Sequence, residues 1–272
     1  MEFHKPKPVH SWREFLTEIG VVVIGVSIAL AAEQTVEWLH WRNQVAEARD
    51  VIATEFSRSV VNSIARLRTR DCAEKRLDEL ASILDLAAAK GSLPPVGEFG
   101  SPPRRLWASG VWNGVVASQT ATHFPGQELA VLATAYQLVD RANEYSVDEG
   151  YAWARLSTMV GPGRRLDAAS EADLRRAISL ARYQNRMLAG IASVVIYRAN
   201  ALALPFSKSD RDAITAIQSQ TLTSDKVSPL VPWPFFMVCR PLGTVPAQYG
   251  NTSLPTGYDG ADLKMNLARP SD

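Results

Sequence analysis

The sequence has very few of the residues that build metal or redox sites. It contains only two cysteines and four histidines. The cysteines, Cys72 and Cys239, lie too far apart along the chain for a CxxC zinc or redox motif. No two histidines are three or four residues apart, so the helical histidine pair that begins many zinc-protease sites is missing. The sequence therefore predicts no metal site and no cofactor.

The sequence also has no excess of positive over negative charge, or the reverse, beyond one unit. The chain of 272 residues has 29 Lys and Arg against 28 Asp and Glu, a net charge of +1. Such a balance creates no broad field for nucleic acid, and we expect no nucleic-acid partner. A hydrophobic share of 46% with 21% charged residues is typical of a folded protein, long enough for one or two domains.

Catalytic motifs are weak or missing. No G-x-S-x-G occurs, and the hydroxyl residues and histidine within 118–123 lack the strand, turn and helix pattern of a hydrolase. Asp148 and Glu149 are neighbours, so on a helix they point in different directions. Trp107 and Trp112 could stack a ligand, although core packing is the expected role. No catalytic residue is assigned, and the sequence does not predict an enzyme.

Proline is missing between Ser11 and Pro94, and a capping box formed by Ser11 and Glu14 predicts that a helix begins there. Residues 19–32 contain no charge at all. This run allows two interpretations. With the basic residues before it and the "ALAAEQ" stretch at 29–34, it could be a cleaved signal peptide. It could also be an uncleaved membrane helix.

Three features favour the uncleaved helix. Helix-permissive sequence continues through the supposed cleavage site. The acidic residues Glu18 and Glu33 lie only at the two ends of the run, where they reach the headgroups. Aromatic residues flank the run, and the first and third of them would lie about 39 Å apart on a helix, close to the width of a bilayer with its interfaces. These expected membrane-interface anchors are Trp12, Phe15, Trp38 and Trp41. A core helix of a soluble protein would keep a polar face, which is missing here.

The flanking charges predict the orientation. Three basic residues precede the run and two, Arg42 and Arg49, follow it closely, which favours a cytoplasmic N-terminus. The bulk of the chain would then lie outside the cytoplasm, where Cys72 and Cys239 could form a disulfide. Two unrelated buried thiols remain the alternative.

Small residues follow one face of the predicted membrane helix. Gly25, Ala29 and Ala32 form a small-xxx-small pattern that allows another helix to approach closely. The pattern indicates a protein partner or a homo-oligomer formed through this helix. The alternative is that glycine and alanine are simply common in membrane helices.

The rest of the chain predicts an all-α fold. We expect a cytoplasmic segment at 1–17, a transmembrane helix at 18–41, an antiparallel helical bundle at 42–222 and a proline-rich irregular segment at 223–272. In the bundle, the apolar stripe lapses at 68–71, which predicts a new helix from Cys72 to about Lys90. Further helices are expected at 105–122, from Pro125 toward Val160 with an interruption at Gly150, from a Ser170 cap to Pro205, and at 209–221. No strand pattern is found, and "PLVPWPFFMVC" is expected to pack across the bundle.

The string "EIGVVVIGVSIAL" with its aromatic and acidic exit resembles the N-terminal anchor of uncharacterised single-pass bacterial membrane proteins. The region of Cys72 and the stretch "PPRRLWASGVWNGVVASQTATHF" are also similar to such proteins. The resemblance implies a single-pass bacterial membrane protein. Together with the orientation predicted from the flanking charges, this places the chain in the bacterial inner membrane, with most of it in the periplasm. We expect a membrane-anchored binding or assembly protein, a subunit or accessory of a larger membrane complex. A ligand-sensing domain, or an enzyme with its site in the bundle core, is the alternative.

The first prediction is that the mature protein retains residues 1–32, because the helical sequence continues unbroken through the possible cleavage site. Mass spectrometry of protein purified from membranes measures the mature N-terminus directly. A mature N-terminus near Ala32 would contradict the membrane-helix interpretation.

Overall fold

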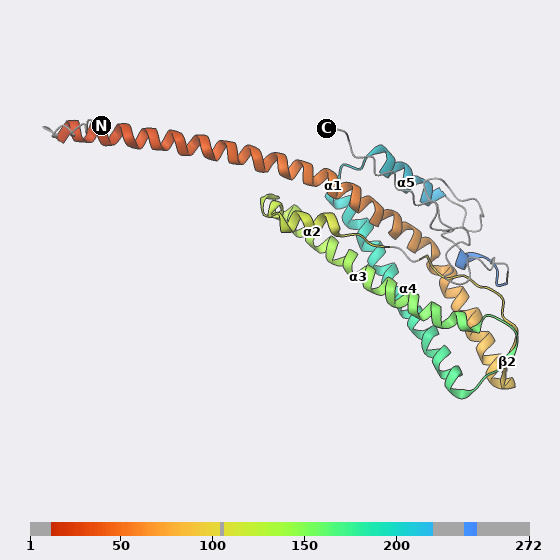
Figure 1. The fold of residues 1–272 in the computed structure, drawn as a ribbon. Coiled ribbons are helices and arrows are strands. Elements are labelled where there is room, and N and C mark those ends of the chain that lie inside the picture. The colour runs from red at the N-terminus through yellow and green to blue at the C-terminus, as the bar shows by residue number, and fades with distance from the viewer. Residues whose placement is uncertain (1–11, 104–105, 220–236, 244–272) are drawn as a thin grey trace, which may run out of the picture.

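The computed structural model describes residues 12–103, 106–219 and 237–243 (Figure 1). Across these residues the fold is all-α, which confirms the predicted fold class. Most of the proline-rich segment predicted at 223–272, including most of "PLVPWPFFMVC", lies outside the described residues.

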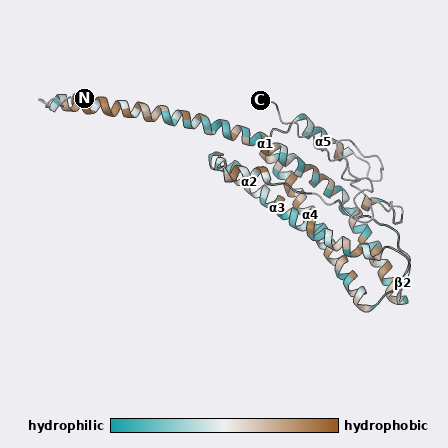
Figure 2. Ribbon diagram, in the orientation of Figure 1, coloured by the Kyte–Doolittle hydropathy of each residue, from teal (hydrophilic) through white to brown (hydrophobic). Residues whose placement is uncertain are grey.

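One helix dominates the molecule. α1 runs from Trp12 to Lys90, 79 residues without a break, which corresponds to a length of about 118 Å. Its first part projects from the molecule, whereas its second part forms one wall of a bundle (Figure 1). Figure 2 shows hydrophobic residues along the projecting part, where no neighbouring helix covers them.

The predicted break at 68–71 is wrong, because α1 continues through it. The apolar stripe lapses there for another reason: the core itself is polar at this level. Arg66 and Thr69 are buried, and the Thr69 hydroxyl donates back to the Ala65 carbonyl within the helix at 3.0 Å. In the sequence, a polar residue on the buried face of a continuous helix interrupts the apolar stripe and so resembles the end of a helix.

The bundle consists of three long helices. α3 (Gly126–Leu156) and α4 (Ala168–Leu202) run antiparallel to each other (Figure 1). α4 packs closely along both α1 and α3, whereas α3 meets α1 through larger side chains such as Tyr136, which contacts Phe56. Leucine and alanine fill the space between them at fully buried positions such as Leu77, Leu84, Leu132 and Leu188. The buried alanines of α4 allow this helix to approach α1 and α3 closely. Gly150 does not interrupt α3, which ends at Leu156 and continues as a 3₁₀ turn, η2 (Ser157–Met159).

Two helix starts differ from the prediction. α4 is capped by Asp167, whose carboxylate accepts from the Ser170 backbone N–H at 2.7 Å, so the cap lies three residues before the predicted one. The helix expected at 105–122 is shorter: α2 spans Gly110–Ala117 and is followed by a 3₁₀ turn, η1 (Thr120–His123). Gln119, between them, has a φ of +63° and ends the helix.

Short elements cover the remaining faces. β1 (Ser92–Leu93) pairs antiparallel with β2 (Arg164–Arg165), a sheet too short to leave an alternating pattern in the sequence. α5 (Lys208–Ser219) and the 3₁₀ turn η3 (Met237–Cys239) both pack on α1.

Gly100 lies directly against η3. Its φ is +65°, and a side chain there would meet the Met237 backbone at 2.8 Å. The lack of a side chain at Gly100 therefore allows the start of η3 to pack this closely on the segment at 91–103.

Candidate functional site

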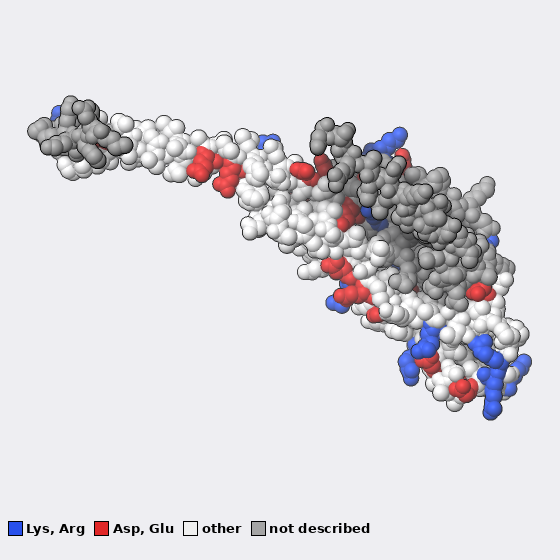
Figure 3. All heavy atoms as spheres, viewed as in Figure 1, with Lys and Arg blue, Asp and Glu red and all other residues white. Residues whose placement is uncertain are grey.

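The predicted membrane helix is the exposed part of α1. Residues 15–32 form the most hydrophobic stretch of the helix. Their mean hydropathy is 2.2, and none of them is buried. By length and composition this helix is able to cross a membrane, as the sequence predicts. Figure 3 shows an uncharged surface between the N-terminal tip and a group of acidic side chains nearer the bundle.

The predicted interface residues occupy two different environments. Trp12 and Trp38 are 72% and 58% exposed, and the Phe15 ring lies 5.7 Å from that of Trp12. Trp41, in contrast, is half-buried and stacks on the His123 ring at 3.8 Å, with the two rings nearly parallel. Trp41 therefore joins the projecting helix to the bundle.

A second contact strengthens this junction. The Arg49 guanidinium on α1 forms a bidentate pair with the Glu128 carboxylate in the first turn of α3, at 2.8 and 2.6 Å. The same guanidinium lies over the Phe124 ring at 5.5 Å. Because Trp41 contacts η1 and Arg49 contacts the first turn of α3, the bundle is fixed to the base of the projecting helix. Sequence reasoning did not find these contacts, which join positions far apart in the chain.

The face with small residues is open in this structure. Gly25, Ala29 and Ala32 are all exposed, and a side chain at Gly25 would meet nothing within 4 Å. The single chain thus places no helix against them, and their predicted role as a helix–helix interface stays a prediction.

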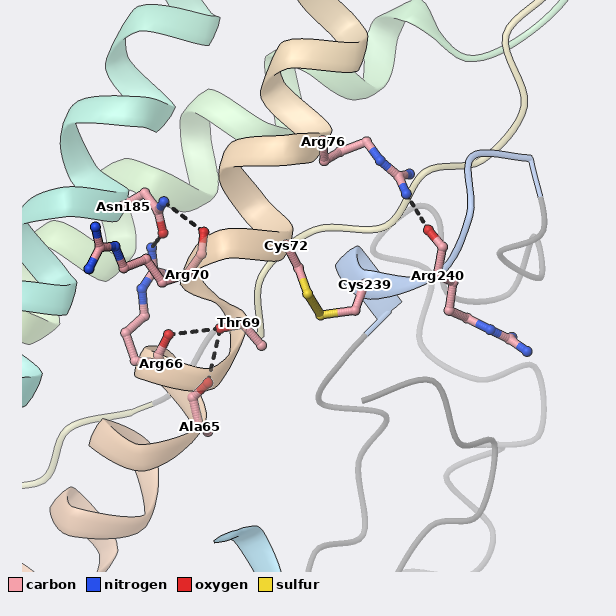
Figure 4. The surroundings of a disulfide bond; sticks show 9 residues. All are labelled: Ala65, Arg66, Thr69, Arg70, Cys72, Arg76, Asn185, Cys239 and Arg240. Carbon is pink, nitrogen blue, oxygen red and sulfur yellow. Dashed lines mark hydrogen bonds between the residues drawn. A yellow bond between two sulfur atoms is a disulfide. The ribbon is translucent and has the colours of Figure 1, made fainter. Parts of the chain in front are cut away.

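A buried polar layer crosses the middle of the bundle. The Arg66 guanidinium donates to both carboxylate oxygens of Glu149, at 2.6 and 2.7 Å, and also donates to the Asn185 side-chain oxygen at 2.5 Å. Asn185 in turn donates to the Arg70 carbonyl and to Glu74. Side chains from α1, α3 and α4 therefore meet in one network, part of which is drawn in Figure 4. Asp148 is exposed while Glu149 is buried, so the two do point in different directions as predicted.

A small void lies beside this layer. Its volume of about 10 Å³ is room for about one water molecule. The Arg66 Nε atom is buried without a hydrogen-bond partner, and Ser146 lines the same void. A single water could bridge such groups, but no substrate would fit. Among the residues that the structure describes, no cluster of histidine, cysteine and acidic residues could hold a metal ion.

The tryptophans considered as ligand platforms belong to the core. Trp107 and Trp112 are buried, and Trp112 stacks on Tyr136 with ring centroids 5.2 Å apart. The buried Glu55 carboxylate accepts from the backbone N–H groups of Val111 and Trp112, so α1 supplies the cap of α2. Burial, and next the charge of Glu55, raise the pKa of Tyr136 far above its usual range, so this phenol remains neutral.

A disulfide joins Cys72 on α1 to Cys239 in η3, with 4.8 Å between the Cα atoms (Figure 4). The neighbouring Arg76 side chain, which is almost fully buried, donates to the carbonyl groups of Phe99 and Arg240. One turn of α1 therefore holds the C-terminal segment by a covalent bond and by hydrogen bonds.

Comparison of the chain with protein-family models, with curated proteins and with solved structures finds no match in any of the three.

The second prediction concerns the disulfide. Denatured, unreduced protein should bind no maleimide, and reduction should expose two thiols per chain. The bond closes a loop of 167 residues, for which the chain-entropy model gives a stabilisation of about 5 kcal/mol. Two reactive thiols in protein that was never reduced would contradict the bond and weaken the placement of the bundle outside the cytoplasm.

The third prediction is that Glu149→Gln destabilises the fold by about 3–5 kcal/mol, because it leaves the Arg66 charge buried without its counter-charge. Urea unfolding of the full chain in detergent measures the loss. The matched control is Glu144→Gln, which breaks a solvent-exposed pair with Arg141 and should shift the midpoint far less. Equal shifts of the unfolding midpoint for the two variants would show that the buried pair stabilises the fold no more than the exposed pair.

Proposed function

We propose that this chain is a single-pass membrane protein whose helical bundle is held close to the membrane surface, where it binds a protein partner as a subunit or accessory of a larger membrane complex. The observation that carries the proposal is that α1 has an exposed, uncharged part at 19–32 and a buried part at 45–87 within one unbroken helix. The exposed, uncharged part is able to contact lipid, and the second part packs its apolar stripe in the bundle core.

The junction supports a docking role. A flexible linker would let the bundle sample many positions, whereas Trp41 on His123 and Arg49 on Glu128 fix its position relative to the anchor. A partner in or near the same membrane then meets a surface whose position is fixed relative to the anchor, which lowers the entropy lost on binding.

The polar layer among the described residues of the bundle favours binding at a surface over catalysis or ligand sensing. The void beside Arg66 has room for about one water molecule. The Glu149 carboxylate, which could otherwise act as an acid or base, is engaged by Arg66 through both oxygens. These contacts are those of a structural ion pair.

The proposed location is the bacterial inner membrane, with the bundle in the periplasm. The basic residues before the run at 19–32 favour a cytoplasmic N-terminus, and the Cys72–Cys239 bond suits an oxidising compartment. The resemblance of the anchor to those of uncharacterised bacterial membrane proteins agrees with this location.

The fourth prediction tests the anchor. Replacing both Val23 and Ile24 by aspartate places two charges at the centre of the run, each costing about 2.5–3.5 kcal/mol in a membrane helix. The variant should move from the carbonate-resistant membrane fraction to the soluble fraction, and partners that co-purify with the native chain from membranes should be lost.

The matched control is Val36→Asp, which adds an exposed acid beyond Glu33, at the expected interface. This variant should stay in the membrane fraction with its partners. Complete extraction of the native chain by carbonate would overturn the proposal.

A further inference from the structure

α4 has two apolar faces, and the bundle uses only one of them. The inner face is buried against α1 and α3. On the outer face, seven uncharged residues recur at alternating spacings of three and four positions. This set, here called the α4 seam, is Leu180, Tyr183, Met187, Gly190, Val194, Tyr197 and Ala201.

The seam is open to solvent. Tyr197 is 67% exposed, Tyr183 51% and Leu180 41%, and only Met187 is partly covered. A helix in a bundle needs one apolar stripe and normally carries polar residues on its outer face. A second stripe of this length is therefore a surface that fits a further partner.

The spacing identifies the kind of partner. Apolar residues at alternating intervals of three and four are the a and d positions of a coiled coil. The seam covers three heptads, about 32 Å of helix. A seam of this kind packs best against a helix with the same repeat, and α4 of a second copy carries the same repeat over the same length.

We propose that two copies of this chain associate through their α4 seams, side by side and parallel. The parallel direction rests on the proposed function, because two chains anchored in one membrane point the same way. The seam itself holds no charge, so a symmetric contact places no like charges in its centre.

The charges beside the seam agree with the parallel direction. Arg186, with 67% of its side chain exposed, lies on the α1 side near Glu74. Glu144, 63% exposed, lies on the α3 side, where it binds Arg141 and is followed by the exposed Asp148. The α3 side therefore has an acidic excess.

A two-fold axis parallel to the helices brings the α1 side of one copy opposite the α3 side of the other. Tyr145 meets Tyr183 at 6.3 Å, which places Glu144 within one turn of the height of Arg186. In an antiparallel pair, the side that carries Arg186 would face the same side of the second copy.

Gly190 lies at the centre of the seam and provides the sharpest test. A side chain there would meet nothing within 4 Å in the single chain, so Gly190→Arg should fold normally. In the proposed dimer the arginine would be buried at the contact and should raise the dissociation constant by about tenfold or more. Energy transfer between differently labelled full chains in lipid vesicles, measured on dilution with lipid, gives this constant.

The matched control is Gly114→Arg. Gly114 is also an exposed helical glycine with open space around it, but it lies on α2 away from the seam. This variant should associate like the native chain. Circular dichroism and thermal unfolding confirm that both variants are folded.

Cysteine cross-linking tests the direction. The native cysteines are bonded to each other, so an introduced cysteine is the free thiol. Single Tyr183→Cys and Tyr197→Cys variants should each form a disulfide-linked dimer with themselves, because a parallel pair places equal positions together. Cross-links that form only when the two variants are mixed would reveal an antiparallel pair and overturn the proposed arrangement.

Two further outcomes would overturn the inference. A native chain that remains monomeric in vesicles would mean that the seam is covered within the chain or by another protein. Association that survives Gly190→Arg but is lost in Gly25→Leu would assign the contact to the membrane helix alone. Because carbonate extraction tests the anchor separately, failure of the seam leaves the proposed membrane function untouched.

Discussion

The structure depends on one continuous helix, α1, whose two parts have different surroundings. Between Trp12 and Lys90 the backbone of α1 satisfies its own hydrogen bonds, which is the condition for crossing lipid. Its side chains change from an uncharged surface at 19–32 to a stripe that faces α3 and α4. The bundle cannot be separated from the projecting helix without cutting the element on which both are built.

The polar layer in the bundle centre has a different consequence. A wholly apolar interface between three long helices, rich in alanine and leucine, would tolerate sliding by one turn. The bidentate contact of Arg66 with Glu149, joined by Asn185, is satisfied at one register only. A buried ion pair adds little to stability compared with apolar residues of the same size, and its best-attested use is to fix register. We regard this layer as the feature that sets the relative heights of α1, α3 and α4.

Local patterns predicted the helices well and their contacts poorly. Proline spacing and apolar periodicity indicated the all-α fold, and the uncharged run marked the projecting helix. The false break at 68–71 has the same cause as the missed polar layer: a buried Arg66 or Thr69 looks like surface until its partners are known. The pairing of Arg66 with Glu149, and of Trp41 with His123, joins residues that lie far apart in the chain. No local pattern signals such a contact. The sequence analysis did not identify the α4 seam, because only burial shows which apolar residues of α4 the bundle leaves open.

The unbroken course of α1 makes the molecule a lever. In the proposed arrangement, roughly 48 residues of this helix follow the membrane span predicted at 18–41, which corresponds to an arm of about 72 Å. Membrane helices tilt readily by tens of degrees in response to bilayer thickness and to neighbouring helices. Because the helix is continuous from one part to the other, a change of about 10° in tilt would move the far end of the bundle, where β1 and β2 lie, by about 13 Å. A change in bilayer thickness would thereby change the position of the far end of the bundle, at a distance from the membrane that the lipids themselves do not reach.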